Sequence, residues 1–554
     1  MGSWIARRAR RTPDRVAVIY CGTVLTYAGL HQRVTRLAHG LRGLGVRRGD
    51  RVAYLGPNHP SFLETLFAAG TLGAVVVPLN ARLAVPELAR HLAGSGSTML
   101  IYGAGQAQTV AALRPGFGPG HVVALAEPGE REIDYTELLA TGTGAAIDEP
   151  VSLDDPFLIM YTSGTTGGAK GATLTHGNIT WNALNVLVDA DFRQDEVALV
   201  VAPLFHTAAL NMLCLPTLLK GGAVLIEPGF EPGRALELIG RHRVTSLFGV
   251  PAIYDAMAAH PGWAAADLSS LRMLLCGGAP VPGATIRTYT ERGLAFIQGY
   301  GMTETSPGAL LLDAAHVQTK AGSAGVPHFF TEVRVARPDE SEAAPGETGE
   351  ILVAGPNVMR GYWNQPEATA AVLAGGTWLR SGDAGAADED GYVFVVDRIK
   401  DMIISGGENV YPAEVENVLR EHPAVADCGV IGVPDARWGE VGRAVVVLRP
   451  GAQASEGELL GFLDGRIARY KIPKSVRYAG ELPRTGTGKI LKKRLRETHG
   501  ASASPGEHSS SPGASPRTHG PEPPRAPMAP EPQAARPHRA ASPGERPPGT
   551  ADSA

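Results

Sequence analysis

The 554-residue sequence predicts an α/β fold, in which a large N-terminal domain of parallel-rich sheets is flanked by helices. Short runs rich in Val and Leu alternate with amphipathic segments from residue 51 to about residue 297. This alternation is typical of parallel strands covered by helices on both faces. The chain is also too long for a single hydrophobic core, which indicates two or more domains.

The expected strands of this region are short and apolar, as buried parallel strands are. They span residues 51–55, 75–78, 98–101, 198–202, 223–226, 246–249 and 271–276. The expected helices between them repeat apolar residues at helical spacing. They span residues 61–73, 85–94, 208–219, 233–243 and 281–292.

From about residue 331 the pattern changes to short strands with turns, such as 349–353 and 392–396, which predicts a small β-subdomain. A compact α+β unit follows, with expected helices near 413–420 and 456–468 and strands near 425–432 and 441–448. We therefore divide the chain into an N-terminal domain (1–396), a linker (397–400), a C-terminal domain (401–498) and a tail (499–554).

We predict that the tail is disordered. Residues 501–554 contain no Leu, Ile, Val, Phe, Tyr or Trp and are dense in Pro, Ser, Gly and Ala. Such a composition buries too little apolar surface to offset the entropy lost on ordering.

Composition narrows the class of protein. A net charge of −4 indicates no nucleic-acid partner. Four scattered cysteines without a C-x-x-C pair argue against disulfides and structural zinc, and favour the cytoplasm. The apolar stretch 62–79 is short and interrupted, so we expect no membrane span. Arginines at positions 7, 8, 10 and 11 leave peripheral contact with anionic lipid possible. The oligomeric state is not predicted.

The strongest local signal is a Gly/Thr-rich segment from Tyr161 to Gly171, which leaves the apolar run 157–160. Glycines let backbone N–H groups face an anion, and Ser/Thr hydroxyls add donors. The predicted phosphate contacts are Thr162, Ser163, Gly164, Thr165, Thr166, Gly167 and the cation Lys170. A Walker A loop fails at Ala169 and Gly171, where that motif requires Gly and Ser/Thr. A turn without function is the alternative, but it does not account for eleven residues with a lysine in register.

This segment resembles the signature of the acyl-adenylate-forming superfamily, which includes acyl-CoA synthetases, luciferase-like enzymes and peptide-synthetase adenylation domains. Further motifs resemble those of the family in the same order, and the resemblance covers about residues 10–497. It implies that a small carboxylic acid reacts with ATP and Mg²⁺ to give an acyl-adenylate, and that the acyl group then passes to coenzyme A. Ala169 departs from the family's usual proline, and we expect weaker ATP binding from it.

The resemblance assigns a nucleotide site. Asp383, in the segment Ser381-Gly382-Asp383, would bind the ribose together with Arg398. Thr303 would contact the α-phosphate, and Glu304 would hold the magnesium, as a hard carboxylate oxygen can. The remaining nucleotide contacts would be Gly277, Gly278, Ala279, Gln298, Gly299, Tyr300 and Gly301, with Tyr300 against the adenine.

The C-terminal domain resembles the mobile lid of the same family. Lys400 would be the hinge, and Gly406 and Gly407 would approach the pantetheine arm of CoA. Lys489, in Pro483-Arg484-Thr485-Gly486-Thr487-Gly488-Lys489-Ile490, would reach the carboxylate and the α-phosphate. The predicted catalytic residues are therefore Lys489, Glu304 and Thr303.

The predicted acyl pocket is apolar, with small residues at depth. It comprises Trp181, Phe205, His206, Thr207, Val250 and Met302, together with Gly277 and Gly301. This composition fits a fatty or an aryl acid, and each buried CH₂ of an alkyl chain would contribute about 0.8 kcal/mol. The resemblance is greatest to fatty-acyl-CoA synthetases, which implies an acyl-CoA synthetase for a medium- to long-chain fatty acid. The alternatives are an aryl-acid CoA ligase of the coumarate or benzoate kind and a luciferase-like enzyme. An amino-acid substrate is disfavoured because no acidic residue flanks Phe205 and His206.

A non-catalytic homologue is the hypothesis from another class. Such a protein should have lost Lys489, Glu304 or Asp383, and the sequence retains all three.

We predict that deletion of residues 501–554 leaves turnover and melting temperature nearly unchanged, because the tail has no Leu, Ile, Val or aromatic residues with which to pack against the folded domains. Steady-state kinetics and thermal unfolding of the truncated chain would check this, and a fall in either would show that the tail supports the fold.

Overall fold

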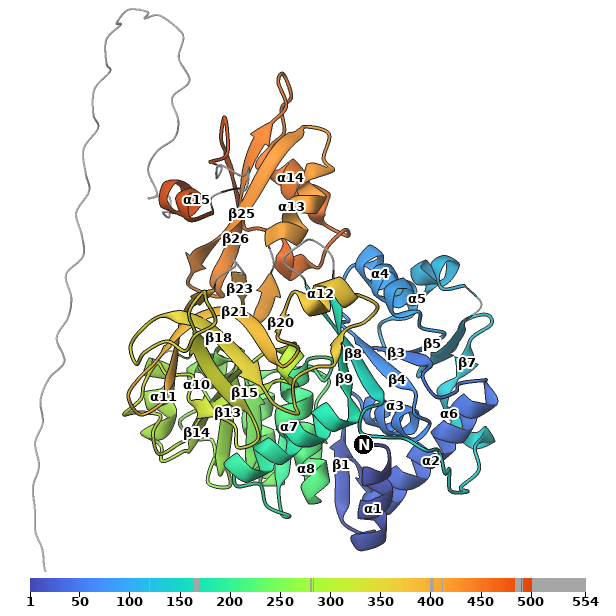
Figure 1. Cartoon of the computed structure of the whole chain (residues 1–554). Helices are drawn as coiled ribbons and strands as arrows, with labels where there is room; N and C mark the ends of the chain where they lie inside the picture. Colours follow the sequence, from blue (N-terminus) through green and yellow to red (C-terminus); the bar gives the residue numbers. More distant parts are fainter. Residues whose placement is uncertain are drawn as a thin grey trace, which may run out of the picture. The chain divides into compact units, whose positions relative to one another are not determined.

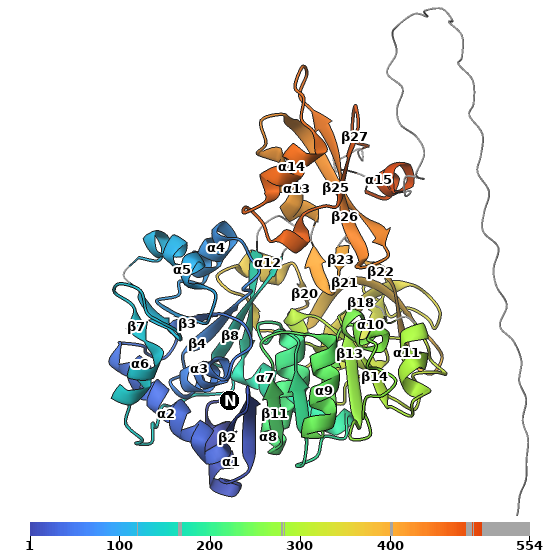
Figure 2. The same ribbon diagram turned by 180° about the vertical axis from the view of Figure 1, so that it is seen from behind.

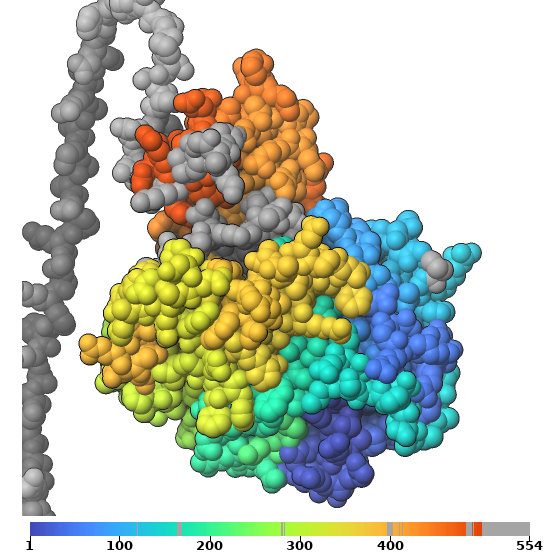
Figure 3. Space-filling view, in the orientation of Figure 1, coloured from blue at the N-terminus to red at the C-terminus, as the bar shows by residue number. Residues whose placement is uncertain are grey.

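The computed structural model describes residues 1–118, 120–163, 169–278, 281, 283–398, 403–410, 412–483, 490 and 492–500. Three sheets precede residue 399 and a fourth follows residue 402. In Figure 1 the strands of the fourth sheet lie in a separate lobe, drawn in orange. Figure 3 shows the residues coloured blue to yellow as one continuous body.

The first sheet has eight strands, and six of them run parallel. Its order is β19 (Gly361–Tyr362), β9 (Ala169–Thr175), β8 (Pro156–Ser163), β4 (Val75–Leu79), β3 (Arg51–Leu55), β5 (Met99–Tyr102), β6 (His121–Ala124) and β7 (Ile133–Asp134). The antiparallel pair β8–β9 flanks the Gly/Thr-rich segment, with Thr162 opposite Lys170. Both residues therefore lie at the same end of this pair.

The second sheet has nine strands, of which the six in the middle run parallel. Its order is β16 (Val326–Pro327), β15 (Gly308–Leu312), β14 (Phe296–Gly301), β13 (Met273–Gly277), β12 (Ser246–Gly249), β10 (Val197–Val200), β11 (Ala223–Ile226), β1 (Val16–Tyr20) and β2 (Thr23–Thr26). Antiparallel strands close both edges.

Two five-stranded sheets complete the fold. The third contains β17 (Glu332–Ala336), β18 (Gly349–Ala354), β21 (Trp378–Ala387) and β20 (Leu373–Ala374), with β22 (Val393–Arg398) paired to β21. The fourth contains β24 (Glu408–Val410), β23 (Ile403–Ser405), β26 (Gly439–Leu448) and β25 (Val425–Asp435), with β27 (Ser475–Tyr478) paired to β26.

Helices cover both faces of the large sheets, with α7 in front in Figure 1 and α9 in front in the reverse view of Figure 2. Those before residue 200 are α1 (Ser3–Arg11), α2 (Tyr27–Gly43), α3 (Pro60–Thr71), α4 (Val85–Ser95), α5 (Ala107–Leu113), α6 (Tyr135–Thr141) and α7 (His176–Asp189). Those after it are α8 (Leu215–Lys220), α9 (Pro232–His242), α10 (Pro251–Ala259), α11 (Gly283–Thr290), α12 (Pro366–Ala370), α13 (Pro412–Arg420), α14 (Glu456–Leu463) and α15 (Lys492–His499). Single turns are η1 (Arg114–Gly116), η2 (Ala209–Cys214), η3 (Thr303–Thr305) and η4 (Arg469–Lys471).

The α/β prediction is confirmed, and the differences have local causes. The helix expected over 208–219 begins as the π-helical η2 and becomes α-helical only at Leu215, next to Pro216. The helix expected over 456–468 ends at Leu463, because Asp464 is extended and Gly465 takes a φ of 73°. Strand β9 was not predicted, because the sequence at its start is rich in glycine and has the composition of a loop. The predicted domain boundaries remain predictions.

A buried asparagine fixes the turn between β14 and β15, which carries Thr303 and Glu304. The side-chain nitrogen of Asn357 donates to the carbonyl oxygens of Thr305 (3.0 Å) and Gly308 (2.6 Å). The hydroxyl of Thr331 donates to Asn357 Oδ1 at 2.9 Å. Because buried polar groups are costly to leave unpaired, this set of bonds holds the turn in one conformation.

We expect Asn357→Ala to lower the free energy of unfolding by about 3 kcal/mol, since it orphans two buried carbonyl oxygens. It should also raise the KM for ATP, because the turn carries residues of the predicted nucleotide site. Chemical denaturation and initial-rate kinetics would check both effects, with the exposed Asn417→Ala as the control. An unchanged denaturation midpoint would contradict the structural role.

Candidate functional site

A cavity of about 1160 Å³ lies where the parallel strands of the second sheet end. Residues that follow β10, β12, β13 and β14 line it, together with residues after β4 and residues from the C-terminal lobe. Ligands of open α/β sheets bind at the carboxyl ends of strands, so this position is the expected one for a substrate site. The lining brings together motifs that are widely separated in the sequence.

The predicted adenosine contacts converge at one side of the cavity. Tyr300 lies near the end of β14, and its hydroxyl donates to Asp383 Oδ2 at 2.7 Å. Asp383 lies on β21 and is buried. Gly277 and Gly278 also line the cavity. A Cβ on Gly277 would lie 2.7 Å from the carbonyl oxygen of Gly299, so only glycine permits this spacing of β13 and β14.

The described residues predicted to bind phosphate and magnesium lie close together around Glu304. Its Oε1 accepts a hydrogen bond from the Tyr362 hydroxyl at 2.8 Å and lies 3.5 Å from the Thr162 hydroxyl. The ammonium of Lys170 lies 4.9 Å from the centre of the Tyr362 ring. A carboxylate and a hydroxyl are oxygen donors that suit Mg²⁺, which commonly takes few protein ligands and completes its shell with phosphates and water. Among the described residues, no cluster of three or more His, Cys, Asp or Glu could hold a metal ion.

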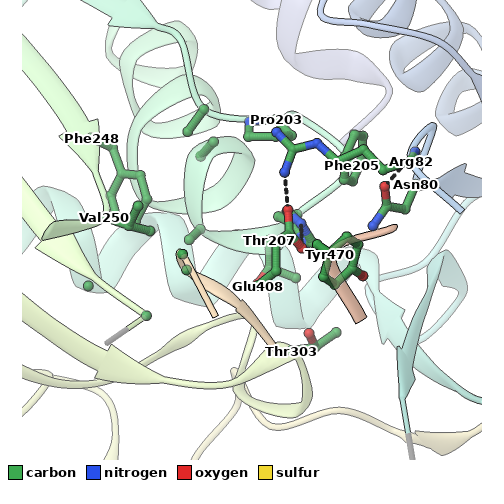
Figure 4. A pocket seen from close by; sticks show the side chains of 18 of the residues that line it. Asn80, Arg82, Pro203, Phe205, Thr207, Phe248, Val250, Thr303, Glu408 and Tyr470 are labelled. Atoms are coloured by element: carbon green, nitrogen blue, oxygen red, sulfur yellow. Dashed lines mark hydrogen bonds and ion pairs between the residues drawn. The ribbon is translucent and has the colours of Figure 1, made fainter. Parts of the chain in front are cut away.

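Seven of the eight residues proposed for the acyl pocket line the cavity: Phe205, His206, Thr207, Val250, Gly277, Gly301 and Met302. Figure 4 shows Phe248 and Val250 together at one wall, away from Phe205. Trp181 is not among the lining residues of the described chain. Its ring packs 5.1 Å from that of Phe330, edge to face. Trp181 lies outside the buried set of α7 that Asn178, Ile179 and Asn182 exemplify, so we remove it from the pocket.

Several residues of the cavity wall were not predicted from the sequence: Met212, Phe230, Phe248 and Ile253. Phe248 lies on β12, immediately before Gly249 and Val250. Its position at the carboxyl end of a predicted parallel strand was the available signal.

The C-terminal lobe contributes one side of the cavity. Gly406 and Gly407 line it and take φ values of 58° and 82°, which a residue with a side chain rarely adopts. The next residue, Glu408, forms ion pairs with Arg82 and, at 3.3 Å, with His206 (Figure 4). Burial alone would raise the pKa of Glu408, but His206 and Arg82 outweigh it and the pKa is lowered. Glu408 therefore stays ionised, and the sequence analysis did not anticipate it.

Several predicted residues lie outside the described residues: Gly164, Thr165, Thr166, Gly167, Ala279, the hinge Lys400 and the catalytic Lys489. The backbone of Arg398 ends β22, paired with Asp383. In the part of the chain that the structure describes, no helix is long and apolar enough to span a membrane.

Sequence comparison gives two matches to family models. Residues 5–363 match the AMP-binding enzyme model, and residues 414–489 match the model of the AMP-binding enzyme C-terminal domain. The chain belongs to the AMP-binding enzyme family. The superfamily predicted from the motifs is therefore confirmed.

Named relatives of this family are CoA ligases. The chain is 59% identical over 500 residues to a feruloyl-CoA synthase from an Amycolatopsis species, which covers 90% of this chain and 99% of the relative. It is 44% identical over 498 residues to an indoleacetate–CoA ligase of Aromatoleum aromaticum, which covers 90% of this chain and 98% of the relative.

Two solved structures of o-succinylbenzoate CoA synthetase from Bacillus subtilis are also similar. A double mutant with a bound product analogue, OSB-NCoA, has a TM-score of 0.80 at 35% identity and covers 89% of this chain and 98% of that chain. A complex with ATP and magnesium ion has a TM-score of 0.67 at 34% identity and covers 89% and 99%. The chain is an AMP-forming acid–thiol ligase that uses ATP and coenzyme A.

We expect Glu304→Gln to slow acyl-adenylate formation by at least about 100-fold, because it removes a negative oxygen from the predicted magnesium site. The amide oxygen can still accept from Tyr362, so the fold should be retained. Pyrophosphate release under saturating ATP and Mg²⁺ would check this, with the exposed Glu237→Gln as the control. A rate within a few-fold of the wild type would remove Glu304 from the metal site.

Proposed function

We propose that this protein is an aryl-acid CoA ligase, acting on a substituted phenylpropenoic acid such as ferulate or on an arylacetic acid. The observation that carries this proposal is the 59% identity, over nearly the whole chain, to a protein named feruloyl-CoA synthase. The similarity to an indoleacetate–CoA ligase supports the same class of acid. The expectation of a fatty acid gives way to the aryl-acid alternative.

The described walls of the cavity are consistent with a flat aromatic substrate. Phe205, Phe230 and Phe248 line it, together with Met212 and Ile253. Aromatic faces and edges pack well against an aryl ring, which contributes about 0.5–1.5 kcal/mol per pair beyond the area buried. The apolar composition alone fits an aliphatic chain as well as an aryl ring. The aromatic wall residues are therefore what favours an aryl acid.

The two half-reactions follow from the chemistry of the substrates. A carboxylate oxygen attacks the α-phosphorus of ATP, the bond to pyrophosphate breaks, and a mixed anhydride forms. The CoA thiolate then attacks the acyl carbonyl carbon, and AMP leaves. The carboxylate and the triphosphate are both anions, and two like unit charges about 4 Å apart repel by about 4 kcal/mol at an effective dielectric of 20. Cations must therefore offset this repulsion. In our proposal Lys170 and Lys489 supply positive charge, and Glu304 binds the magnesium.

We further propose that the domain arrangement described here serves the second half-reaction. Gly406 and Gly407 line the cavity, which leaves a side-chain-free approach for a slender pantetheine arm. The TM-score is 0.80 with the product-analogue form of o-succinylbenzoate CoA synthetase and 0.67 with its ATP form. Adenylation would require the lobe to turn about Lys400 and deliver Lys489.

The proposal predicts a clear order of substrates. CoA-dependent AMP formation should give a kcat/KM for ferulate, 4-coumarate or indole-3-acetate at least about 100-fold above that for octanoate or palmitate, because only the aryl acids match the aromatic walls. Parallel assays with equal ATP and CoA would measure this. A higher kcat/KM for a fatty acid would overturn the aryl-acid assignment and leave the ligase activity standing.

A further inference from the structure

A buried cluster of three charges joins the C-terminal lobe to helix α4. Lys471 Nζ lies 2.9 Å from Glu87 Oε1 and 2.8 Å from Glu414 Oε1. The side chains of Lys471 and Glu87 are only 3% and 2% exposed, and that of Glu414 is 17% exposed. Glu87 belongs to α4 of the N-terminal part, whereas Glu414 and Lys471 lie on α13 and η4 of the lobe. We call these three residues the charge latch.

Each member of the charge latch is held by its own element. Glu87 is the third residue of α4, and its Oε2 accepts from the backbone N–H of Ala84 at 2.9 Å, which caps the helix. Its other oxygen is thereby aimed at the lobe. Glu414 lies in the first turn of α13. Lys471 ends η4 and itself lines the cavity, as do Glu414, Tyr470 and Lys474, whereas Glu87 is not among the lining residues of the described chain.

The charges of the latch favour one arrangement of the C-terminal lobe relative to helix α4. Burial alone would lower the pKa of Lys471, but the charges of Glu414 and Glu87 outweigh it and the pKa is raised. A charge taken out of water is costly without a partner, so Lys471 needs a carboxylate wherever it is buried. Movement of the lobe away from α4 would separate Lys471 from Glu87 but not from Glu414. The contact with Glu87 is therefore the part that depends on the arrangement.

Helix α4 also reaches the phosphate end of the cavity. One turn after Glu87, the ring of His91 stacks on Tyr161 with centroids 4.1 Å apart and planes 3° apart. Burial, with a contribution from the charge of Lys471, lowers the pKa of His91 to about 3, so this ring is neutral. Tyr161 lies on β8, next to Thr162. The latch therefore docks the lobe on a helix that is packed against the strand leading to the phosphate segment.

We propose that Lys471 is a positioning residue for transfer of the acyl group to CoA: through Glu87 it holds the lobe where Gly406 and Gly407 line the cavity. This role requires no contact between Lys471 and the reacting atoms. It depends on the acid–thiol ligase activity and on the domain arrangement proposed above, and it is independent of which acid is the substrate.

The test separates the two half-reactions. Lys471→Met and Glu87→Gln should each slow thioester formation from supplied acyl-adenylate and CoA by at least about tenfold and raise the KM for CoA. Pyrophosphate release without CoA should stay within about twofold of the wild type. Glu87→Gln keeps an oxygen for the helix cap and does not alter a cavity-lining residue, so its effect cannot come from a lost contact with CoA.

Three further variants distinguish positioning from folding. The exchange Glu87→Lys with Lys471→Glu restores an ion pair between α4 and the lobe, but it loses the carboxylate that caps α4 and places a second carboxylate beside Glu414, so it should recover only part of the lost transfer rate. Lys471→Arg should recover part of it. Arg469→Ala, which changes an exposed residue of the same turn, should have no effect.

Equal losses in both half-reactions, or an unchanged transfer rate in Glu87→Gln, would overturn the inference. Any acid that the wild-type enzyme adenylates can be used. A failure of the aryl-acid assignment would appear in the substrate comparison and not in this experiment.

Discussion

The carboxylate of Glu304 joins two sheets that are built from different parts of the chain. Glu304 follows strand β14 of the nine-stranded sheet, whereas its partners Tyr362 and Thr162 lie on β19 and β8 of the eight-stranded sheet. The cavity occupies the junction between these strand ends. Because adenylation must bring a carboxylate and a triphosphate together, the proposed site depends on this junction for the predicted metal ligand and the predicted hydroxyl donors.

Much of this arrangement could be predicted from the sequence, because the motifs are short and chemically distinctive. Thr162, Lys170, Tyr300, Glu304 and Asp383 are spread over more than 200 residues, and the fold gathers most of them around one cavity. Many strands of the parallel regions could also be predicted, since short apolar runs that alternate with amphipathic segments are typical of them. Others, such as β1 and β14, were not predicted. The strand β9 could not be predicted, because its first residues have the composition of a loop.

The acyl pocket was harder to predict, because a wall residue is defined by the direction of its side chain. Trp181 has the large apolar side chain expected of a pocket residue, but it lies on the face of α7 that contacts Phe330. Phe248 lines the cavity, and only its position at the carboxyl end of a predicted strand indicates this in the sequence. The charge latch had no sequence signal either, since Glu87 and Lys471 are 384 residues apart and each has the appearance of a surface charge.

The hydrogen bond between Tyr300 and Asp383 bears on how tightly a nucleotide can be held. In the proposed assignment the ribose hydroxyls bond to the same carboxylate that the phenol already occupies. A ribose hydroxyl that replaced the phenol at Oδ2 would exchange one neutral donor for another, and that single bond would add little to the affinity. Release of AMP after each turnover would be correspondingly easy, because the tyrosine hydroxyl is at hand to replace the departing sugar.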